Sequence, residues 1–315
     1  ISTGANFGWS AASGDATGDG IPDLLVGSYS SGIVTLYAGS STSFDTGVDS
    51  TMTSTAGYFG YAVALADVNG DGKADAVVGA WGYDSGQTDE GSVSVYHATG
   101  SGFSTSANVV IQSNETSAFL GQAVTSLGDV DHDGYEDIAV GVPQFDNGQT
   151  NEGTVFVYRG SATGLNTTPQ AALEANVDSA YFGSALASAG DVNGDGYRDL
   201  IVGAGNAEFS LASEGGAWVY YGGASGISTS SAWYMAGGQT SAECGSAVSG
   251  LGDINGDGFD DVAVGCGMYD AGLADNGAVF VYFGSAAGLS TVPAWSAFGS
   301  AASAHLGMRL LGAAG

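Results

Sequence analysis

The feature that most constrains this chain is a nine-residue acidic loop that recurs five times at a nearly fixed spacing. In the copy at residues 67–75, oxygen-bearing side chains occupy positions 1, 3, 5 and 9, and glycine occupies position 6. The spacings between successive copies are 52, 62, 62 and 62 residues, and the copies begin at Asp15, Asp67, Asp129, Asp191 and Asp253. A motif with a fixed period indicates a repeat protein whose units share one local fold.

The side chains of this loop suit a hard cation. Calcium takes six to eight oxygen ligands, and backbone carbonyls count among them. Glycine at position 6 permits a backbone conformation that a side chain would obstruct, and position 7 varies, as expected for a residue that offers only its carbonyl. We therefore predict about five Ca²⁺ sites. The predicted ligands, loop by loop, are Asp15, Thr17, Asp19, Ile21 and Asp23; Asp67, Asn69, Asp71, Lys73 and Asp75; Asp129, Asp131, Asp133, Tyr135 and Asp137; Asp191, Asn193, Asp195, Tyr197 and Asp199; and Asp253, Asn255, Asp257, Phe259 and Asp261.

Without a cation these loops are unfavourable. Three carboxylates about 4 Å apart form three repelling pairs, each costing roughly 4 kcal/mol at an effective dielectric constant near 20. A single Asp/Asn/Gly turn that binds nothing is common. Five copies with the same offsets favour the metal interpretation.

An EF-hand loop begins in the same way but requires a glutamate at position 12. The segment after each loop here is short, rich in β-branched residues and bounded by glycine, as in 75–80 and 137–142, which is typical of a strand rather than an exiting helix. Position 12 is valine in all five copies: Val26, Val78, Val140, Val202 and Val264.

Each unit contains four predicted strands. In the fourth unit they cover 182–190, 200–204, 216–221 and 231–236, with the acidic loop between the first two. Four-stranded antiparallel units repeated radially form a β-propeller, whereas a linear stack of β-units is the alternative. We predict an all-β propeller with blades at about 7–58, 59–119, 120–181, 182–243 and 244–305.

Residues 306–315 resemble the first strand of a sixth unit, because Gly307 lies one period after Gly245. The sequence therefore predicts five full blades and one strand of a sixth, all within a single domain of residues 1–315. We expect this domain to be a fragment of a propeller with six or seven blades.

The charge balance limits the partners. The chain has 4 Lys+Arg against 33 Asp+Glu, a net charge of −29, which five divalent ions would reduce to −19. Such a surface repels nucleic acid and anionic membranes. No run of 18 apolar residues is present, so this segment is not expected to insert into a membrane. Weak calcium loops need abundant calcium, which favours a secreted or cell-surface protein.

The two cysteines, Cys244 and Cys266, lie symmetrically about residue 255, in the turn between two predicted antiparallel strands. Residues opposite each other in a hairpin lie within disulfide reach. The counterparts in the fourth unit, Phe182 and Ala204, are apolar, so two buried thiols are the alternative. The sequence leaves both open.

At the end opposite the acidic loops, longer loops recur at 81–91, 143–153 and 267–277. Their aromatic residues could contact a ligand, or each could pack over its own loop. The residues are Trp81, Tyr83, Phe145 and Tyr269.

Phe-Gly begins the first strand at 7–8, 59–60 and 182–183, and Gly-Ala-like residues follow the second strand. Together with the acidic loops, these motifs resemble the FG-GAP repeats of integrin α-subunit propellers, and more closely those of bacterial secreted relatives. The resemblance covers the whole chain. It implies a propeller, usually seven-bladed, with calcium on the lower face and ligands on the upper face. Leu120 and Cys244 depart from Phe-Gly and the Gly-Ala-Pro motif is incomplete, so integrin-type partner binding gains no support.

We predict a calcium-binding extracellular scaffold for adhesion or ligand binding, with a protein or glycan ligand opposite the calcium loops. The alternatives are a carbohydrate-binding lectin and the accessory propeller of a larger secreted enzyme. We expect no catalysis, because sixteen of the 33 acidic residues are predicted metal ligands and the histidines fall at unrelated repeat positions: His97, His132 and His305.

Removal of calcium with EDTA should lower the melting temperature. A bound ion stabilises the folded state by RT ln(1+[L]/Kd), or about 2.7 kcal/mol per site when calcium is at 100 times Kd. Acidification of the calcium-loaded protein should act in the same direction, since protonated aspartate does not serve the cation. Thermal melts followed by circular dichroism test this, and a curve that EDTA leaves unmoved would contradict the metal sites.

Overall fold

The structure of the protein, a computed structural model, describes residues 6–42 and 47–310. The regular secondary structure of these residues consists of β-strands only. The described part contains no helix long and apolar enough to cross a bilayer. The all-β prediction is confirmed.

The strands form five sheets of four strands each, and in every sheet the strands are neighbours in chain order. Adjacent strands run antiparallel, as the registers of the first sheet show. This is the strand content expected of β-propeller blades. The strands are β1 (Ser10–Gly14), β2 (Asp23–Ser28), β3 (Ile33–Tyr37), β4 (Ser50–Thr53), β5 (Ala62–Ala66), β6 (Asp75–Ala80), β7 (Ser92–Tyr96), β8 (Val109–Gln112), β9 (Ala123–Gly128), β10 (Asp137–Val142), β11 (Thr154–Tyr158), β12 (Ala171–Glu174), β13 (Ala185–Gly190), β14 (Asp199–Ala204), β15 (Gly216–Tyr220), β16 (Trp233–Ala236), β17 (Cys244–Gly252), β18 (Asp261–Cys266), β19 (Ala278–Tyr282) and β20 (Trp295–Phe298).

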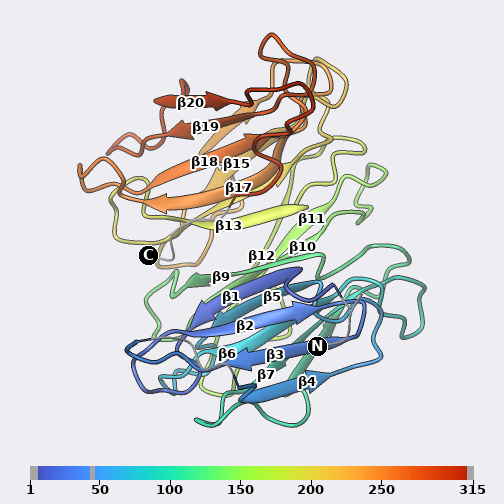
Figure 1. The fold of residues 1–315 in the computed structure, drawn as a ribbon, viewed down its shortest axis with the longest axis vertical. Coiled ribbons are helices and arrows are strands. Elements are labelled where there is room, and N and C mark those ends of the chain that lie inside the picture. The colour runs from blue at the N-terminus through green and yellow to red at the C-terminus, as the bar shows by residue number, and fades with distance from the viewer. Residues whose placement is uncertain (1–5, 43–46, 311–315) are drawn as a thin grey trace. The chain divides into compact units, whose positions relative to one another are not determined.

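The described chain forms two compact units. The N-terminal unit contains residues up to 129 together with 133–142 and 156–170, and the C-terminal unit contains 130–132, 143–155 and the residues from 171 onward. In the N-terminal unit β1 packs beside β5 and β5 beside β9, and Figure 1 shows the blue strands β1–β4 in front of the cyan strands of the second sheet. In the C-terminal unit β13 packs beside β17.

The core of each unit lies between the faces of neighbouring sheets. The second strand of a sheet is covered on both faces, and all six residues of β6, β10, β14 and β18 are buried. Their continuous apolar sequence follows from this position, because both faces pack against side chains. The outer strands are the most exposed, as in β20, where Trp295 is 55% exposed.

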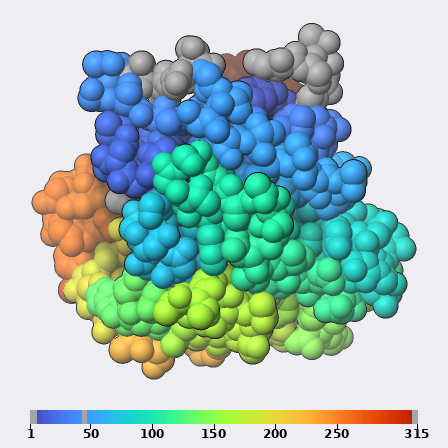
Figure 2. All heavy atoms as spheres, turned by 90° about the horizontal axis from the view of Figure 1, so that it is seen from below, coloured from blue at the N-terminus to red at the C-terminus, as the bar shows by residue number. Residues whose placement is uncertain are grey.

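Side chains and outer loops also fill the space between repeats. In the N-terminal unit the turn after β7 reaches the outer strand β4 of the preceding sheet, where the Phe103 amide donates to Ser50 Oγ at 3.4 Å. Figure 2 shows the blue atoms of the first repeat in continuous contact with the cyan to green atoms of the second.

Two glycines join each pair of neighbouring repeats within a unit. The glycine of the Phe-Gly motif has a left-handed backbone, with φ of +82° at Gly60 and +81° at Gly245. Its carbonyl oxygen lies against the glycine near the end of the preceding second strand. A Cβ atom at Gly203 would lie 2.0 Å from the Gly245 carbonyl oxygen, and one at Gly79 would lie 2.1 Å from that of Gly121. Backbones can approach this closely only where no side chain intervenes.

The residue before the Phe-Gly glycine fills the core. Phe59 is 1% exposed, and Phe182, Leu120 and Cys244 are fully buried, whereas Phe7 of the first repeat is 43% exposed. Leucine and cysteine thus occupy the same buried position as phenylalanine. Leu120 and Cys244 therefore keep the apolar contact of the phenylalanine that they replace, with side chains of different volume.

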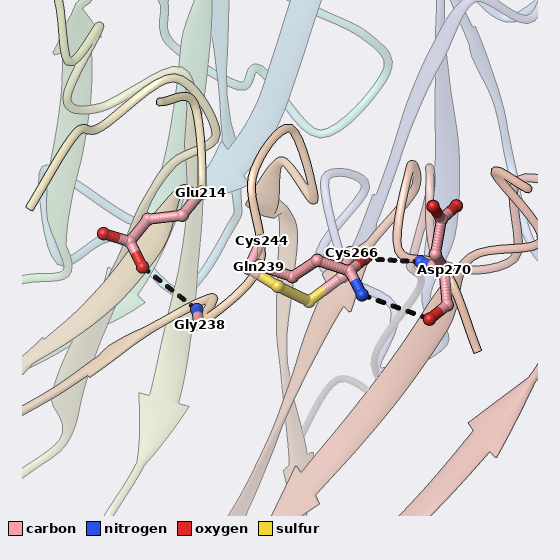
Figure 3. The surroundings of a disulfide bond; sticks show 6 residues. All are labelled: Glu214, Gly238, Gln239, Cys244, Cys266 and Asp270. Atoms are coloured by element: carbon pink, nitrogen blue, oxygen red, sulfur yellow. Dashed lines mark hydrogen bonds between the residues drawn. A yellow bond between two sulfur atoms is a disulfide. The ribbon is translucent and has the colours of Figure 1, made fainter. Parts of the chain in front are cut away.

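Cys244 and Cys266 form a disulfide, which resolves the choice left open by the sequence. The two residues face each other in the β17–β18 register, and both are fully buried. Figure 3 shows the bond beside Gln239, whose side chain accepts from the amide of Asp270 and donates to its carbonyl. The covalent link closes the hairpin that carries the fifth acidic loop.

The predicted start of a sixth unit is described only in part, because residues 311–315 lie outside the described residues. Leu306 forms an isolated parallel bridge with Gly277, and a Cβ atom at Gly265 would lie 2.0 Å from the Gly307 carbonyl oxygen. These contacts repeat those of Cys244 and Gly245 with the fourth sheet. The blade boundaries and the single-domain assignment stay predictions.

Replacement of Gly203 by alanine should destabilise the protein by about 1–3 kcal/mol or more, because the new methyl group would overlap the Gly245 carbonyl. Urea unfolding in calcium measures the change. Gly223→Ala is the matched control, since a Cβ atom there meets nothing within 4 Å. Equal unfolding midpoints for the two variants would contradict the close-packed glycine contact.

Candidate metal centres

The five acidic loops each join the first and second strands of a sheet. The first aspartate of the loop folds the chain around its own carboxylate. Asp15 accepts hydrogen bonds from the amides of Gly18 (2.7 Å), Asp19 (3.1 Å) and Gly20 (2.7 Å). Asp191 and Asp253 accept the same set of amides in their loops. The carboxylate at position 1 therefore organises the loop backbone.

Positions 4 and 6 both require a left-handed backbone. Glycine at position 6 has φ between +82° and +93°, as the sequence predicted for this position. Position 4 was not predicted to matter, yet its φ lies between +61° and +78°. The position-4 residues are Gly18, Gly70, His132, Gly194 and Gly256.

The aspartate at position 9 is a structural anchor as well as a predicted ligand. All five are fully buried. Asp199 Oδ2 accepts the Val192 amide at 3.0 Å, and its Oδ1 accepts the Gly222 amide at 2.9 Å. One carboxylate thus ties the loop to the end of the third strand. The residues bonded in the same way at the third-strand end are Gly39, Ala98, Gly160 and Gly284.

This second role was missed by the sequence analysis. In repeats two to five the bonded amide lies 23 residues after the aspartate. The constant spacing from the position-9 aspartate to a glycine or alanine is the sequence signal that could have indicated this anchoring role.

Burial raises the pKa of three of these anchors. It raises the pKa of Asp75 to about 7, assisted by the charges of Asp71 and Asp67 and opposed by the Ala98 amide. Burial likewise raises the pKa of Asp199 to about 7, and it raises the pKa of Asp261. At position 1, by contrast, the backbone amides led by that of Gly258 lower the pKa of Asp253. The fifth loop therefore pairs a first aspartate whose pKa is lowered with a buried ninth aspartate whose pKa is raised.

The residues present fit a hard cation. Carboxylate oxygens of Asp129, Asp131 and Asp137 all lie within 4.8 Å of one another, the one such cluster among the described residues. In other loops, Asp75 Oδ2 and Thr17 Oγ1 are buried and have no hydrogen-bond partner. Buried oxygens without donors are stabilised by a positive ion. At position 5 the predicted ligands face their own loop, since Asp71 Oδ1 accepts the Lys73 amide at 3.0 Å.

Loops of neighbouring repeats are joined through position 8. The Asp260 amide donates to the Asp191 carbonyl at 3.0 Å, and Asp260 Oδ2 accepts the Asp191 amide at 2.8 Å. Glu136 makes the same pair of bonds with Asp67. An acid at position 8 was not among the predicted ligands, and it links one loop to the next.

The side chain at position 7 also has a role that its variability concealed. It covers position 4 of the preceding loop, so that a Cβ atom at Gly70 would lie 2.8 Å from the Tyr135 ring and one at Gly194 would lie 2.4 Å from the Phe259 ring. Where position 4 is histidine, the His132 ring stacks on Tyr197 with centroids 4.6 Å apart. The exposed His132 thus packs on a neighbouring loop.

The aromatic residues of the opposite loops divide into two groups. Tyr83 packs against the core, and Tyr269 packs on Phe280 with ring centroids 5.5 Å apart. Trp81 instead stacks on Tyr58, with centroids 3.9 Å apart. All three side chains are partly buried, and each contacts neighbouring rings or the core.

Comparison with known proteins agrees with the motifs. The family profile described as FG-GAP repeat matches residues 121–158, 182–220 and 245–282. A second profile, described as FG-GAP-like repeat, matches residues 15–78.

Three curated relatives illustrate the similarity. Integrin alpha-V of Gallus gallus is 39% identical over 211 residues, covering 63% of this chain and 20% of that protein. Integrin alpha-PS3 of Drosophila melanogaster is 40% identical over 158 residues, covering 48% and 14%. Integrin alpha-5 of Xenopus laevis is 32% identical over 222 residues, covering 66% and 21%. The chain spans about a fifth or less of these relatives' length.

The pH dependence of stability should reverse with calcium. In chelator, the folded protein binds protons at Asp75 and Asp199 more tightly than the unfolded chain, because both carboxyls have raised pKa values. Stability should therefore fall as pH rises from about 4 to about 7, by at most on the order of 4 kcal/mol per group. The ion requires ionised carboxylates, so the calcium-induced rise in melting temperature should grow over the same range.

Melts with and without calcium at about pH 5 and about pH 7.5 test this linkage. Asp199→Asn, which removes one titrating anchor, should flatten the pH dependence in chelator. A calcium-induced rise of equal size at both pH values would contradict the assignment.

Proposed function

Because the chain belongs to the FG-GAP repeat family, we propose that it is a calcium-stabilised extracellular scaffold that binds a protein or glycan ligand at the end opposite the acidic loops. Five loops of one design support the calcium part of this proposal. A buried disulfide supports an oxidising compartment such as the cell exterior. In this proposal the chain binds its ligand without chemical turnover.

The observation that carries the proposal is a cluster of six aromatic rings in the N-terminal unit, at the end opposite the acidic loops. Neighbouring rings lie 3.9–5.9 Å apart, centroid to centroid. Trp9 is 36% exposed and Tyr58 is 43% exposed. We call these residues the aromatic cluster: Trp9, Tyr29, Tyr58, Tyr61, Trp81 and Phe119.

The fold itself does not require these rings. The counterparts of Tyr29 and Trp81 in the fourth and fifth repeats are Gly205 and Gly267, and that of Tyr61 in the fourth repeat is Ser184. The sheets of those repeats form without aromatic residues at these positions. Exposed aromatic rings that packing does not demand are typical of binding surfaces.

A glycan is the second candidate ligand, and one contact favours it. A Cβ atom at Gly82 would lie 2.6 Å from the Tyr58 ring and 3.3 Å from Asp89 Oδ1. A carboxylate therefore lies beside the stacked Tyr58–Trp81 pair. An aromatic face next to a hydrogen-bond acceptor suits a sugar, which presents C–H groups and hydroxyls together.

Replacement of both Trp9 and Tyr58 by alanine should reduce ligand binding by at least about tenfold, because exposed aromatic anchors dominate such surfaces. The measurement is binding of the labelled chain to a glycan array and to cultured cells treated with protease or glycosidase. Protease sensitivity would identify a protein ligand, and glycosidase sensitivity a glycan.

The matched control is Tyr234→Ala, which removes a ring that is 61% exposed but lies on β16, outside the aromatic cluster. This variant should bind like the parent chain, and all variants should keep the calcium-dependent melting temperature. Binding that survives loss of Trp9 and Tyr58, or no binding to either cells or array, would refute the proposal.

A further inference from the structure

A second set of buried polar groups occupies the end of the repeats opposite the acidic loops. One residue of each long loop, just before the third strand, is buried at the same repeat position. Its exposure is 0% at Glu90 and Glu152 and 1% at Glu214 and Asn276. A buried carboxylate is unfavourable unless its oxygens find donors or a positive ion.

In the fourth and fifth repeats both terminal atoms of this residue have partners. Glu214 Oε1 accepts amides including that of Ser210 at 2.7 Å. Glu214 Oε2 accepts the Gly238 amide at 3.1 Å, and Figure 3 shows this second bond. Asn276 Oδ1 accepts the Ala271 amide and Nδ2 donates to the Gly299 carbonyl, both at 2.8 Å. In these repeats backbone groups bond both terminal atoms of this residue.

The third repeat departs from this arrangement. Glu152 Oε1 accepts the Asn147 amide at 2.8 Å, but Glu152 Oε2 is buried and has no hydrogen-bond partner. The backbone donor that serves Glu214 Oε2 has no counterpart at this oxygen.

A second carboxylate lies nearby. Glu174 ends β12 at the position of Ala236 and Phe298 in the later repeats. The side-chain Nδ2 of Asn147 donates to Glu174 Oε1. Asn147 therefore bonds one carboxylate through its backbone and the other through its side chain.

The local charges make the absence of a partner more unfavourable. Burial raises the pKa of Glu152, and the negative charges of Glu174 and Asp146 raise it further. Gln149 in the same loop also has a buried side-chain oxygen without a hydrogen-bond partner. The 143–153 loop and the end of β12 thus supply two carboxylates and a side-chain amide oxygen, and Glu152 Oε2 and Gln149 Oε1 lack hydrogen-bond donors.

We propose that the third repeat holds a calcium ion beneath the 143–153 loop, bound by Glu152, Glu174 and the side-chain oxygen of Gln149. Oxygen ligands of mixed charge are those that calcium prefers. This site lies at the end of the strands opposite the acidic loops and does not depend on them. Its role is to fasten the 143–153 loop to β12 where the backbone offers no donor.

The second repeat provides an internal comparison. Glu90 Oε1 accepts the Ser85 amide at 2.6 Å, and Glu90 Oε2 is likewise buried without a partner. The residue that corresponds to Glu174 is Gln112, so this repeat has a single carboxylate. A second carboxylate beside the first is what would recruit an ion.

The test is the number of calcium ions bound per chain, measured by native mass spectrometry from calcium-containing buffer. Glu174→Gln should bind one ion fewer than the parent chain, because glutamine keeps the acceptor for Asn147 but removes the charge. Gln112→Glu should bind one ion more, by recreating the pair in the second repeat. Glu208→Gln, at an exposed acid in the corresponding loop of the fourth repeat, should leave the count unchanged.

A second measurement separates an ion from a shared proton. If the ion binds, Glu152→Gln lowers the melting temperature in calcium relative to the parent chain. An unchanged count in Glu174→Gln, with a raised melting temperature of Glu152→Gln in chelator at neutral pH, would show that a proton neutralises the pair and would overturn the proposal. Failure of the acidic-loop sites appears differently, as a parent chain that binds a single ion.

Discussion

The buried aspartate at loop position 9 is the interaction on which each repeat depends. In Asp199 the two oxygens receive backbone amides from the start of the acidic loop, at Val192, and from the end of the third strand, at Gly222. A carboxylate can hold two separate chain segments at once because it accepts through both oxygens. Because this carboxylate is buried, its negative charge is unfavourable unless hydrogen-bond donors or a cation compensate it. The fold and the proposed ion binding therefore depend on one side chain.

Contacts between repeats within each unit also depend on backbone groups. At one end, position 8 of a loop bonds position 1 of the preceding loop, as Asp260 does with Asp191. At the other end, the Phe-Gly glycine lies against a strand glycine, as Gly245 does against Gly203. Between them the faces of the sheets bury apolar residues. The high glycine content thus serves close backbone approach rather than flexibility.

Acidic residues are arranged alike in all repeats at one end of the strands and differently from repeat to repeat at the other end. The acidic loops are alike in all five copies, which suits a shared structural ion. The opposite loops vary from repeat to repeat, from the amide-bonded Glu214 to the incompletely bonded Glu152. The aromatic cluster is likewise confined to some repeats. Uniform groups at one end and variable groups at the other are expected when one end stabilises the fold and the other binds partners.

The sequence by itself determined the period, the four-stranded units and the loop positions that carry oxygen, because these depend on contacts within one repeat, where turn chemistry and strand patterning act locally. The sequence did not determine which residues of neighbouring repeats contact one another. The seventh loop position looked free to vary, yet Tyr135 and Phe259 cover glycines of the preceding loop. Trp81 looked like a single exposed ring, but the tertiary structure stacks it on Tyr58 of the preceding repeat and packs it against Phe119 at the end of its own repeat. Only the packing of the sheets sets these distances. The same packing decided that Glu214 Oε2 meets a backbone amide while Glu152 Oε2 does not, because a donor for the second oxygen of a carboxylate depends on where the next segment of backbone passes.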